Sequence, residues 1–336
     1  MTGIGLIGYG YWGPNLARNF SDVANAQLTA CCDLRQDRLD LLGQKYPKVQ
    51  LSTSTADVIG NPKVDAVVIA TPVSTHFRLA REALMAGKHV LIEKPMATSI
   101  SEADELNMLA REKGLTLMVD HTFVYTGAVR KIKEIIDQGE MGEIYYFDSV
   151  RVNLGLFQHD SNVVWDLAPH DLSIMDYLIG RAPSAISAFG ASHLGQGIEN
   201  IAYLNLKFDD NLIAHIHINW LAPVKLRKTL ISGTRKMIVY DDMETSEKVK
   251  VYDSGVSITE APENIHHTLV QYRTGDMYAP KLDQREALSL ECEHFIEAVV
   301  SGIDPATGGH AGRRIVAMLE AAQESLSEQG AWISVH

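Results

Sequence analysis

Ile4-Gly5-Leu6-Ile7-Gly8-Tyr9-Gly10-Tyr11-Trp12-Gly13 is the stretch that decides the fold of the first part of this chain. Its apolar start predicts a short strand, and its glycines, spaced G-x-G-x-x-G, predict a turn that leads directly into a helix. Gly8 permits the tight turn, Gly10 lets the backbone approach a pyrophosphate, and Gly13 lets helix and strand pack closely. The amides of the first helical turn then face the phosphates, at the positive end of the helix dipole. The stretch therefore predicts a dinucleotide-binding site.

An acidic residue supports this prediction. Asp33 follows the next apolar run, Gln27 to Cys32, and stands twenty residues after Gly13. That separation is typical of a carboxylate that accepts hydrogen bonds from the adenosine ribose hydroxyls and repels a 2′-phosphate. Asp33 thus favours NAD over NADP, although Arg35 and Arg38 lie close enough to weaken the preference.

Length and composition limit the classes of protein to which the chain can belong. A chain of 336 residues exceeds what one core usually holds, so two domains are expected. Thirty Lys and Arg against 42 Asp and Glu give a net charge of −12, which disfavours non-specific binding to nucleic acid or anionic lipid. The three cysteines have neither disulfide nor metal spacing, and neither a secretion leader nor a membrane-spanning run is visible. We expect a cytoplasmic protein without a metal site.

Up to about residue 120, predicted strands and helices alternate, which favours a doubly wound parallel sheet of the α/β class. One helix is expected from Ser74 or Thr75 to Gly87 and another from Ser101 to Gly114, with Asp104 as a partial capping box. The expected strands are Gly3–Ile7, Gln27–Cys32, Val64–Ala70, His89–Ile92 and Leu115–Val119. Ligands of such sheets bind beyond the carboxyl ends of the strands, where Gly8–Gly13, Asp33, Thr71-Pro72 and Glu93-Lys94-Pro95 all fall.

After residue 121 the pattern changes to successive antiparallel strands. The division expected is therefore a dinucleotide-binding domain over 1–120 and a substrate-binding and oligomerisation domain over 121–336. Helices are expected over Gly127–Gln138, from Asp283 to Ser301 with Glu286 completing a capping box, and over Gly309–Ser327. The expected strands are Ile144–Asn153, Ala185–Ala191, Ile201–Phe208, Leu212–Trp220, Leu226–Ser232, Lys236–Tyr240, Lys248–Tyr252 and Ala331–Val335.

The hairpin around Asp209-Asp210-Asn211 has two distinct faces. Period-two counting places one apolar set together: Ala202, Leu204, Leu206, Phe208, Leu212, Ala214, Ile216, Ile218 and Trp220. The opposite face mixes Tyr203 and Ile213 with polar residues, which favours a subunit contact over a solvated surface. His215 and His217 could pair on a metal, but no third ligand accompanies them.

Two groups of residues could carry chemistry. Lys94 follows an apolar strand; it is either a solvated lysine or, beside an oxidised nicotinamide ring, an acid–base group with lowered proton affinity. Asp166 and His170 stand four apart at the start of an amphipathic helix that Gly180 closes. They share a helical face if the helix has begun by Asp166, whereas Pro169 favours a later start that leaves Asp166 in the entry loop. A helix cap plus a core histidine is the alternative to a general acid–base histidine.

These motifs in this order resemble the glucose–fructose oxidoreductase/inositol dehydrogenase (Gfo/Idh/MocA) superfamily over essentially the whole chain. They are the glycine-rich start, Thr71-Pro72-Val73-Ser74-Thr75-His76, Glu93-Lys94-Pro95 and Asp166-x-x-x-His170. Gly8–Phe20 and Asn153–His170 are most similar to its sugar-nucleotide branch, including UDP-N-acetylglucosaminuronate 3-dehydrogenases. After Phe123, however, this chain has Tyr125-Thr126-Gly127 where the branch often has Tyr-Asn-Pro.

The resemblance implies an N-terminal Rossmann domain and a C-terminal α/β domain whose open, mostly antiparallel sheet forms the contact of a dimer or tetramer. It implies that Lys94 and His170 are the catalytic pair, that Asp166 holds the sugar hydroxyls, and that the Lys94–Pro95 bond is cis. Together with the glycine-rich loop, it gives these expected cofactor-binding residues: Gly8, Gly10, Tyr11, Trp12, Gly13, Asp33, Arg38, Thr71, Pro72, His76, Glu93, Lys94 and Trp165.

The expected activity is hydride transfer between a secondary alcohol or ketone carbon of a sugar or sugar nucleotide, most simply the 3-position of a UDP-sugar, and NAD. Arg151, Asn153 and Arg227 are candidates for binding an acidic or phosphorylated substrate, because this acidic chain must supply local positive charge for it. The alternatives are a keto-sugar or inositol reductase, an NAD-using glycosidase, and a cofactor-binding sensor without catalysis.

Overall fold

The chain folds into two compact units in a computed structural model that describes residues 1–155, 161–193, 197–259 and 269–336. The first unit contains residues 1–126 and 285–320, and the second contains 127–284 and 321–336. This differs from the expected division into 1–120 and 121–336, because a carboxyl-terminal segment returns to the first unit. Phe295 in that segment packs edge-on against Phe20, with ring centroids 6.1 Å apart. Arg18 also forms a 2.6 Å ion pair with Glu286.

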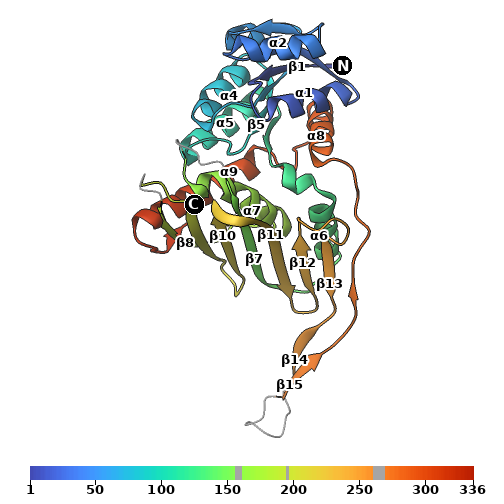
Figure 1. Cartoon of the computed structure of the whole chain (residues 1–336), viewed down its shortest axis with the longest axis vertical. Coiled ribbons are helices and arrows are strands. Elements are labelled where there is room, and N and C mark those ends of the chain that lie inside the picture. Colours follow the sequence, from blue (N-terminus) through green and yellow to red (C-terminus); the bar gives the residue numbers. More distant parts are fainter. Residues whose placement is uncertain (156–160, 194–196, 260–268) are drawn as a thin grey trace. The chain divides into compact units, whose positions relative to one another are not determined.

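The first unit is built on a six-stranded parallel sheet in the order β3-β2-β1-β4-β5-β6 (Figure 1). Its strands are β1 (Thr2–Ile7), β2 (Ala26–Cys32), β3 (Gln50–Ser52), β4 (Ala66–Ile69), β5 (His89–Glu93) and β6 (Leu117–Asp120). Its helical segments are α1 (Gly13–Asp22), α2 (Gln36–Lys45), α3 (Thr55–Ile59), η1 (Val73–Thr75), α4 (His76–Met85), α5 (Ile100–Lys113), η2 (Thr122–Tyr125), α8 (Ala287–Ser301) and the first part of α9 (Gly309–Ser327). The predicted doubly wound parallel sheet is confirmed.

Two helix starts differ from the prediction. Helix α5 is capped by Ser99, whose side-chain oxygen accepts a hydrogen bond from the Glu102 amide, so the predicted start at Ser101 with Asp104 was wrong. Helix α8 begins after Glu286 without a side-chain cap. The reason is tertiary: the Glu286 carboxylate binds Arg18 on α1 instead of closing a capping box with Asp283.

The second unit contains a nine-stranded sheet in the order β16-β13-β12-β11-β7-β10-β9-β8-β17. Within it only β10 and β7 pair in parallel, so the predicted open, mostly antiparallel sheet is also confirmed. Its strands are β7 (Ile144–Leu154), β8 (Ala185–Ala191), β9 (Ile201–Lys207), β10 (Ile213–Asn219), β11 (Leu221–Gly233), β12 (Met237–Asp241), β13 (Val249–Tyr252), β16 (Met277–Tyr278) and β17 (Ile333–Ser334). Helices α6 (Gly127–Asp137) and α7 (Val163–Ile179) belong to this unit, and β14 (Gly255–Thr259) pairs with β15 (Leu269–Arg273) in a separate hairpin.

The two faces of the β9–β10 hairpin behave as the period-two pattern predicts. All nine residues of the apolar set are buried, and helix α7 packs on this sheet. On the opposite face Tyr203 is 40% exposed and Ile213 is 60% exposed. Tyr203 stacks on His217 with ring centroids 4.4 Å apart, and His215 Nδ1 lies 2.9 Å from Asp148 Oδ1. Among the residues described, no group of three or more His, Cys, Asp or Glu side chains is arranged to hold a metal ion.

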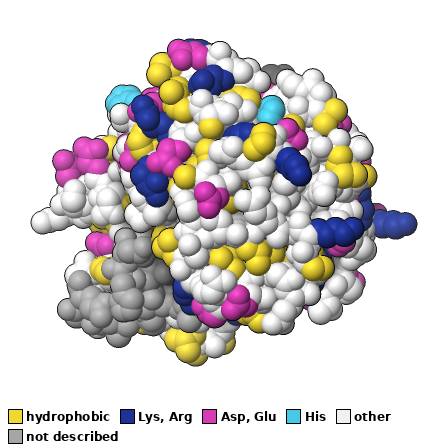
Figure 2. All heavy atoms as spheres, turned by 90° about the horizontal axis from the view of Figure 1, so that it is seen from above, with side chains coloured by type: hydrophobic (Ala, Val, Ile, Leu, Met, Phe, Trp, Pro, Cys, Tyr) yellow, Lys and Arg dark blue, Asp and Glu magenta, His cyan; other side chains and the backbone are white. Residues whose placement is uncertain are grey.

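The surface carries mixed charge. In the face shown in Figure 2, acidic and basic side chains are interspersed with hydrophobic ones. Over the described ranges, none of the helices has both the length and the apolar character needed to cross a bilayer.

Candidate active site

The carboxyl ends of four neighbouring strands in the first unit bring distant sequence motifs to one edge of the sheet. The glycine-rich loop follows β1, and Asp33 follows β2 on one side of it. Thr71-Pro72 follows β4, on the other side of β1, and Lys94 follows the next strand, β5. The motifs expected to bind the cofactor therefore lie at the carboxyl ends of neighbouring strands, as the sequence predicted.

The three glycines of the loop differ in the space that surrounds them. Gly8 has φ +99°, and an added Cβ would lie 2.3 Å from the Ala70 carbonyl oxygen. A Cβ on Gly13 would lie 2.4 Å from the Gly8 carbonyl oxygen, at the start of α1. At Gly10, by contrast, an added Cβ would meet no atom within 4 Å. The loop therefore needs glycine for its own geometry at Gly8 and Gly13, while at Gly10 the backbone is left open to an approaching ligand, which fits a dinucleotide pyrophosphate.

Asp33 organises the same loop. Its Oδ2 accepts a hydrogen bond from the Tyr9 amide at 2.7 Å, and its Oδ1 accepts one from the Arg35 amide at 2.9 Å. A carboxylate oxygen has a second lone pair, so Asp33 can still accept hydrogen bonds from ribose hydroxyls. Arg38 is partly buried and lies 4.0 Å from Asp37. Beside the glycine-rich loop, Tyr11 is 85% exposed and stacks edge-on against Trp12.

His76 is buried, although it belongs to a motif that was expected to bind the cofactor. Its side chain is 1% exposed, with Nε2 2.8 Å from the Thr71 carbonyl oxygen and Nδ1 2.9 Å from the Pro95 carbonyl oxygen. Burial lowers the pKa of His76. The ring thus ties the loop after β4 to the loop after β5, which positions Thr71 and Pro72 rather than presenting the imidazole to a ligand.

The neighbouring residues Lys94 and Glu93 differ in how far they are exposed. Lys94 is partly exposed and begins a cis peptide bond to Pro95, as the family resemblance implies. Glu93 is only 7% exposed, and its Oε2 accepts a hydrogen bond from the Lys94 amide at 3.2 Å. The strand end therefore carries one ammonium group at the edge of the sheet and one carboxyl group within the unit.

In the second unit, helix α7 begins earlier than Pro169 implied. Asn162 is its N-cap, and its Oδ1 accepts hydrogen bonds from the amides of Val164 and Trp165 at 3.1 and 3.2 Å. Pro169 consequently lies inside the helix, and the expectation that it marks the first turn was wrong because the Asn162 cap starts the helix. Asp166 and His170 thus lie one turn apart on the same helix, and both are partly exposed. Part of the Asn153–His170 stretch, residues 156–160, lies outside the described residues.

Asp166 and its neighbours are held by the sheet beneath them. Asp166 Oδ2 accepts a hydrogen bond from Trp220 Nε1 at 3.0 Å, and Trp220 itself is 1% exposed. Trp165, the residue before Asp166, is partly exposed. The start of α7 is therefore fixed both by its cap and by a buried indole, which orients this turn of the helix.

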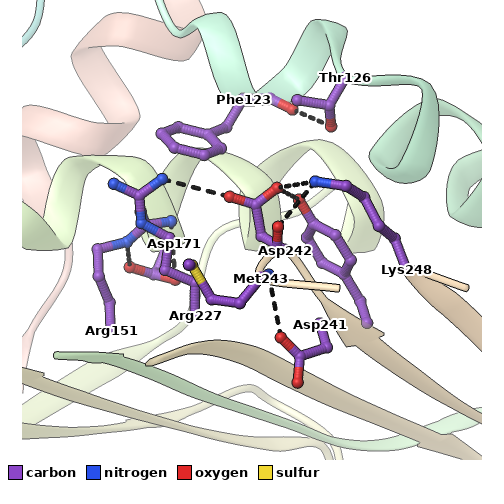
Figure 3. A network of polar contacts seen from close by, with 10 residues as sticks. Phe123, Thr126, Arg151, Asp171, Arg227, Asp241, Asp242, Met243 and Lys248 are labelled. Carbon is purple, nitrogen blue, oxygen red and sulfur yellow. Dashed lines mark hydrogen bonds and ion pairs between the residues drawn. The ribbon is translucent and has the colours of Figure 1, made fainter. Parts of the chain in front are cut away.

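Arg151 and Arg227, the cationic candidates for binding an acidic substrate, differ in their ion pairs (Figure 3). Arg151 is 4% exposed, and its Nε lies 2.5 Å from Asp171 Oδ2 in a buried ion pair, so its charge is already compensated. Arg227 and Lys248 both bind the single carboxylate of Asp242, at 3.2 and 3.0 Å. Asn153, near the end of β7, is partly exposed. The structure thus assigns Arg151 to the interior of the second unit and places two cationic side chains on the carboxylate of Asp242.

At Tyr125-Thr126-Gly127 the chain differs from the Tyr-Asn-Pro of the family branch, and the surroundings of Tyr125 and Gly127 explain the residues found here. Tyr125 is 6% exposed, and its hydroxyl lies 2.9 Å from His294 Nδ1 on α8. A Cβ on Gly127, at the start of α6, would lie 2.1 Å from the Asp283 carbonyl oxygen. This chain therefore needs glycine at 127, because another backbone segment approaches it closely.

Sequence patterns missed a buried group of polar residues next to the cofactor edge. Asp120 ends β6 as the register partner of Glu93, and Glu291 on α8 is 0% exposed. A glutamate in an apolar helix could have raised suspicion, but its partners lie about 170 and 200 residues away in the sequence.

A parallel sheet with a glycine-rich loop open at Gly10, an acidic residue after β2 and a lysine after β5 defines a nicotinamide-dependent oxidoreductase with a second, mostly antiparallel unit. The chain belongs to the GFO/IDH/MocA oxidoreductase family. The family model for the NAD-binding Rossmann fold matches residues 2–121, and that for the GFO/IDH/MocA C-terminal domain matches residues 129–239. The resemblance drawn from the motifs, the enzyme class and NAD as the cofactor are thereby confirmed.

Known relatives span nearly the whole chain. UDP-N-acetylglucosamine 3-dehydrogenase of Acidithiobacillus ferrooxidans is 26% identical, with 93% of each chain covered. Its solved structure has a TM-score of 0.83 and covers 97% of this chain and 98% of its own. The myo-inositol 2-dehydrogenase of Thermotoga maritima is 24% identical, covering 97% of this chain and 96% of its own. Levoglucosan dehydrogenase, solved with NADH and L-sorbose, shares the fold with a TM-score of 0.85, at 18% identity and with 100% and 99% covered.

Proposed function

We propose that this NAD-dependent oxidoreductase transfers a hydride between a secondary alcohol carbon of a sugar nucleotide and the nicotinamide, with the 3-position of a UDP-sugar as the reacting carbon. The observation that carries the proposal is the meeting of an open glycine-rich loop and Lys94 at one edge of the parallel sheet. Cofactors of such sheets bind at this edge, so the ammonium group of Lys94 can exchange a proton with a substrate held beside the nicotinamide.

The residues of this chain have defined tasks in the proposal. The loop amides and the start of α1 bind the pyrophosphate, and Asp33 accepts hydrogen bonds from the adenosine ribose. Bound NAD supplies the carbon that accepts or donates the hydride. Lys94 and His170 take up or release the proton of the reacting hydroxyl, and Asp166 orients the sugar through its hydroxyls.

Two observations favour an anionic sugar derivative as the substrate class. One is the 26% identical relative that acts on UDP-N-acetylglucosamine. The other is the pair of cations, Arg227 and Lys248, which lie close together on one carboxylate in the second unit, since phosphate groups are recognised by such cationic side chains. An uncharged inositol or keto-sugar is the second candidate, because a relative of similar identity is an inositol dehydrogenase.

The acid–base assignment is tested by Lys94→Ala and His170→Ala. Each change should lower kcat by about 10²–10⁴-fold, because that is what a positioned acid or base contributes. Steady-state turnover of a panel of UDP-sugars, inositols and keto-sugars measures the effect, and NADH fluorescence titration checks that the cofactor still binds.

Matched controls are Lys113→Ala, an exposed lysine of α5, and His310→Ala, an exposed histidine of α9. Both should leave turnover unchanged. Full turnover in the Lys94 and His170 variants would remove these residues from the mechanism. Cleavage of a glycosidic bond without net NADH formation would identify the NAD-using glycosidase alternative, and NADH binding with no turnover of any substrate would favour the sensor.

Three further assignments belong to the proposal. Asp33 supports NAD as the preferred cofactor, and tighter binding of NADPH than of NADH would contradict that preference. The half-exposed face with Tyr203 and Ile213 supports a second copy of the chain as its partner, which a purely monomeric species in sedimentation velocity would refute. Three buried, free cysteines fit a cytoplasmic location, which fractionation would test.

A further inference from the structure

The imidazole ring of His76, the first residue of α4, bridges two loops of the first unit. Its Nε2 lies 2.8 Å from the carbonyl oxygen of Thr71, in the loop after β4. Its Nδ1 lies 2.9 Å from the carbonyl oxygen of Pro95, in the loop after β5. Both are ordinary hydrogen-bond distances. Because β4 and β5 are neighbours in the sheet, one buried ring joins the ends of two adjacent strands.

Both partners of this ring are acceptors. A carbonyl oxygen has lone pairs and no proton to donate, whereas a neutral imidazole has one N–H and one nitrogen that can only accept. A neutral His76 could donate to one of the two oxygens, but its other nitrogen would then hold a lone pair against a carbonyl lone pair. Contacts of 2.8 and 2.9 Å on the two sides of the ring therefore require a proton on each nitrogen.

His89, the first residue of β5, has the opposite arrangement in the same unit. Its Nδ1 accepts a hydrogen bond from the backbone amide of Thr116 at 2.9 Å. An amide N–H can only donate, so this nitrogen of His89 has no proton. The two histidines thus differ in the kind of backbone group that their rings face, and His89 is an internal reference for a ring with an unprotonated nitrogen.

The charge around His76 sets the pH at which its second proton binds. Burial lowers the pKa of the ring most, the charge of Lys94 lowers it further, and the two carbonyl contacts raise it. The net direction is downward, so the second proton binds below the ordinary histidine pKa of about 6.5. Other charged groups of α4, α5 and β5 have partners of their own: Arg78 pairs with Glu82, Arg81 with Glu105, Glu102 accepts from Thr98, and Glu93 accepts from the Lys94 amide.

The two loops that the ring joins carry residues expected at the cofactor. The loop after β4 also touches the glycine-rich loop, because a Cβ on Gly8 would lie 3.0 Å from Thr71 Cγ2. Within the same loop, Thr71 Oγ1 lies 2.7 Å from Thr75 Oγ1. The ring of His76 therefore extends a continuous set of contacts from the glycine-rich loop to Pro95.

We infer that His76 is a proton-dependent clasp: with a proton on each ring nitrogen it ties the Thr71 carbonyl to the Pro95 carbonyl, and loss of one proton releases one of the two loops. His76 is then a positioning residue, which acts on a bound dinucleotide only through these loops. The part that concerns the dinucleotide rests on the proposed assignment of the loops to the cofactor, whereas the proton count does not.

The clasp couples proton binding to cofactor binding. Loops that are already held in place cost less ordering when a ligand binds them, so NAD binds the clasped state more tightly. Coupling between two binding events is reciprocal. Bound NAD should therefore raise the affinity of His76 for its second proton.

The first experiment counts the ring protons. Proton–nitrogen correlation spectra of the whole chain, with ¹⁵N-labelled histidine rings, distinguish protonated from unprotonated ring nitrogens. As pH falls from about 8, His76 should change from one protonated nitrogen to two, with a midpoint below about 6.5. Under the conditions that give two protons on His76, His89 should keep an unprotonated Nδ1. An unprotonated nitrogen in His76 over the whole pH range in which the chain stays folded would overturn the clasp.

The ring signals are assigned by their loss in His76→Gln or in His76→Asn. Should neither variant fold, the wild-type ring is assigned instead by through-space contacts of its N–H protons with Thr71 and Pro95. His310→Gln, at an exposed position of α9, should leave the titration of His76 unchanged.

The second experiment measures the coupling to the cofactor. Saturating NAD should raise the His76 midpoint of the wild type by about one pH unit, which is a tenfold coupling. Calorimetry of NAD binding in buffers of different ionisation enthalpy, at the midpoint of the free protein, should show an uptake of up to about half a proton. His76→Gln should lose this uptake, and His310→Gln should keep it. An unmoved midpoint, or equal uptake in wild type and His76→Gln, would overturn the coupling.

Neither experiment uses a substrate. Full turnover in Lys94→Ala and His170→Ala would end the proposed acid–base assignment and leave the proton count of His76 unaffected. A single proton on His76 throughout would end the clasp and leave the acid–base assignment unaffected.

Discussion

At the scale of single residues, the glycine-rich loop separates glycines that the fold needs from one that a ligand needs. Gly8 combines a positive φ with close contact to the Ala70 carbonyl, so any side chain there is strained. Gly10 faces open space, and its lack of a side chain has no structural benefit in the loop itself. The spacing in the sequence identified all the glycines together, but only the coordinates distinguish their roles.

This difference predicts opposite outcomes for two similar substitutions. Gly10→Ala should fold with an unchanged thermal midpoint but weaken NADH binding by about tenfold or more, because the methyl group occupies the space that the pyrophosphate approaches. Gly8→Ala should lower the stability of the first unit by more than about 1 kcal/mol. Differential scanning fluorimetry and NADH titration measure the two effects. Normal cofactor affinity in Gly10→Ala would argue against the loop as the pyrophosphate site.

Residue types alone did not show which polar side chains already interact with other groups inside the protein. Arg151 was an attractive ligand for an acidic substrate, yet it forms a buried ion pair with Asp171. His76 was expected at the dinucleotide, yet both of its ring nitrogens face backbone carbonyl oxygens inside the unit. A sequence shows that a cation or an imidazole exists, but its partner is set by strands and helices that are distant in the chain.

At the scale of elements, helix α7 shows how a cap can outweigh a proline. Pro169 lacks an amide hydrogen and is expected near a helix start. Asn162 instead caps the helix through two amides, and its Nδ2 donates to Glu199 Oε2 at 2.9 Å and to Gln323 Oε1 at 2.8 Å. The helix therefore starts at Val163, which brings Asp166 and His170 onto one face.

We predict that Asn162→Ala destabilises the second unit by about 1–2 kcal/mol, because it removes the cap and leaves the partly buried oxygens of Glu199 and Gln323 without this donor. Asn162→Ser, which keeps a capping oxygen, should lose less. Denaturant unfolding followed by circular dichroism measures both variants. Equal stability of Asn162→Ala and the wild type would show that the cap does not determine where α7 begins.

Most elements with a strong local pattern were predicted, and several elements at the edges of the sheets were not. Helix α9 has the predicted bounds, and the strands of the β9–β10 hairpin differ from prediction only at their ends. Strand β3 and helix α3 were not predicted, nor were β14, β15 and β16, although β4, β6 and β13 are no longer than β14 and were predicted. Their pairing depends on neighbouring strands rather than on their own sequence.

At the scale of the whole molecule, buried carboxyl groups make stability depend on pH. Glu291 has a raised pKa in the folded state, so above its ordinary value of about 4.3 the unfolded chain releases a proton that the folded chain keeps. The free energy of unfolding then falls as pH rises, by up to about 1.4 kcal/mol per pH unit, until the folded pKa is reached. This stabilising contribution is therefore complete at low pH and lost at high pH.

Glu291→Gln cannot release a proton in either state. We therefore predict that the stability of this variant relative to the wild type increases as pH rises from about 5, measured by urea unfolding at several pH values. Glu297→Gln provides the control, since its side chain is exposed and should leave the pH dependence unchanged. Parallel stability curves for wild type and Glu291→Gln would contradict a proton held at Glu291.

The sequence by itself determined the fold class, the family and NAD as the cofactor, and it identified Lys94, Asp166 and His170 as candidates. Each of these depends on glycine spacing, on periodicity or on residues that follow a strand directly, and such signals are local. Only the tertiary structure decided that residues 285–320 join the first unit, that Arg151 is paired, and that Glu291 is fully buried. These outcomes depend on which surfaces pack together and on the charges that burial then forces into contact, and no local pattern in the chain encodes them.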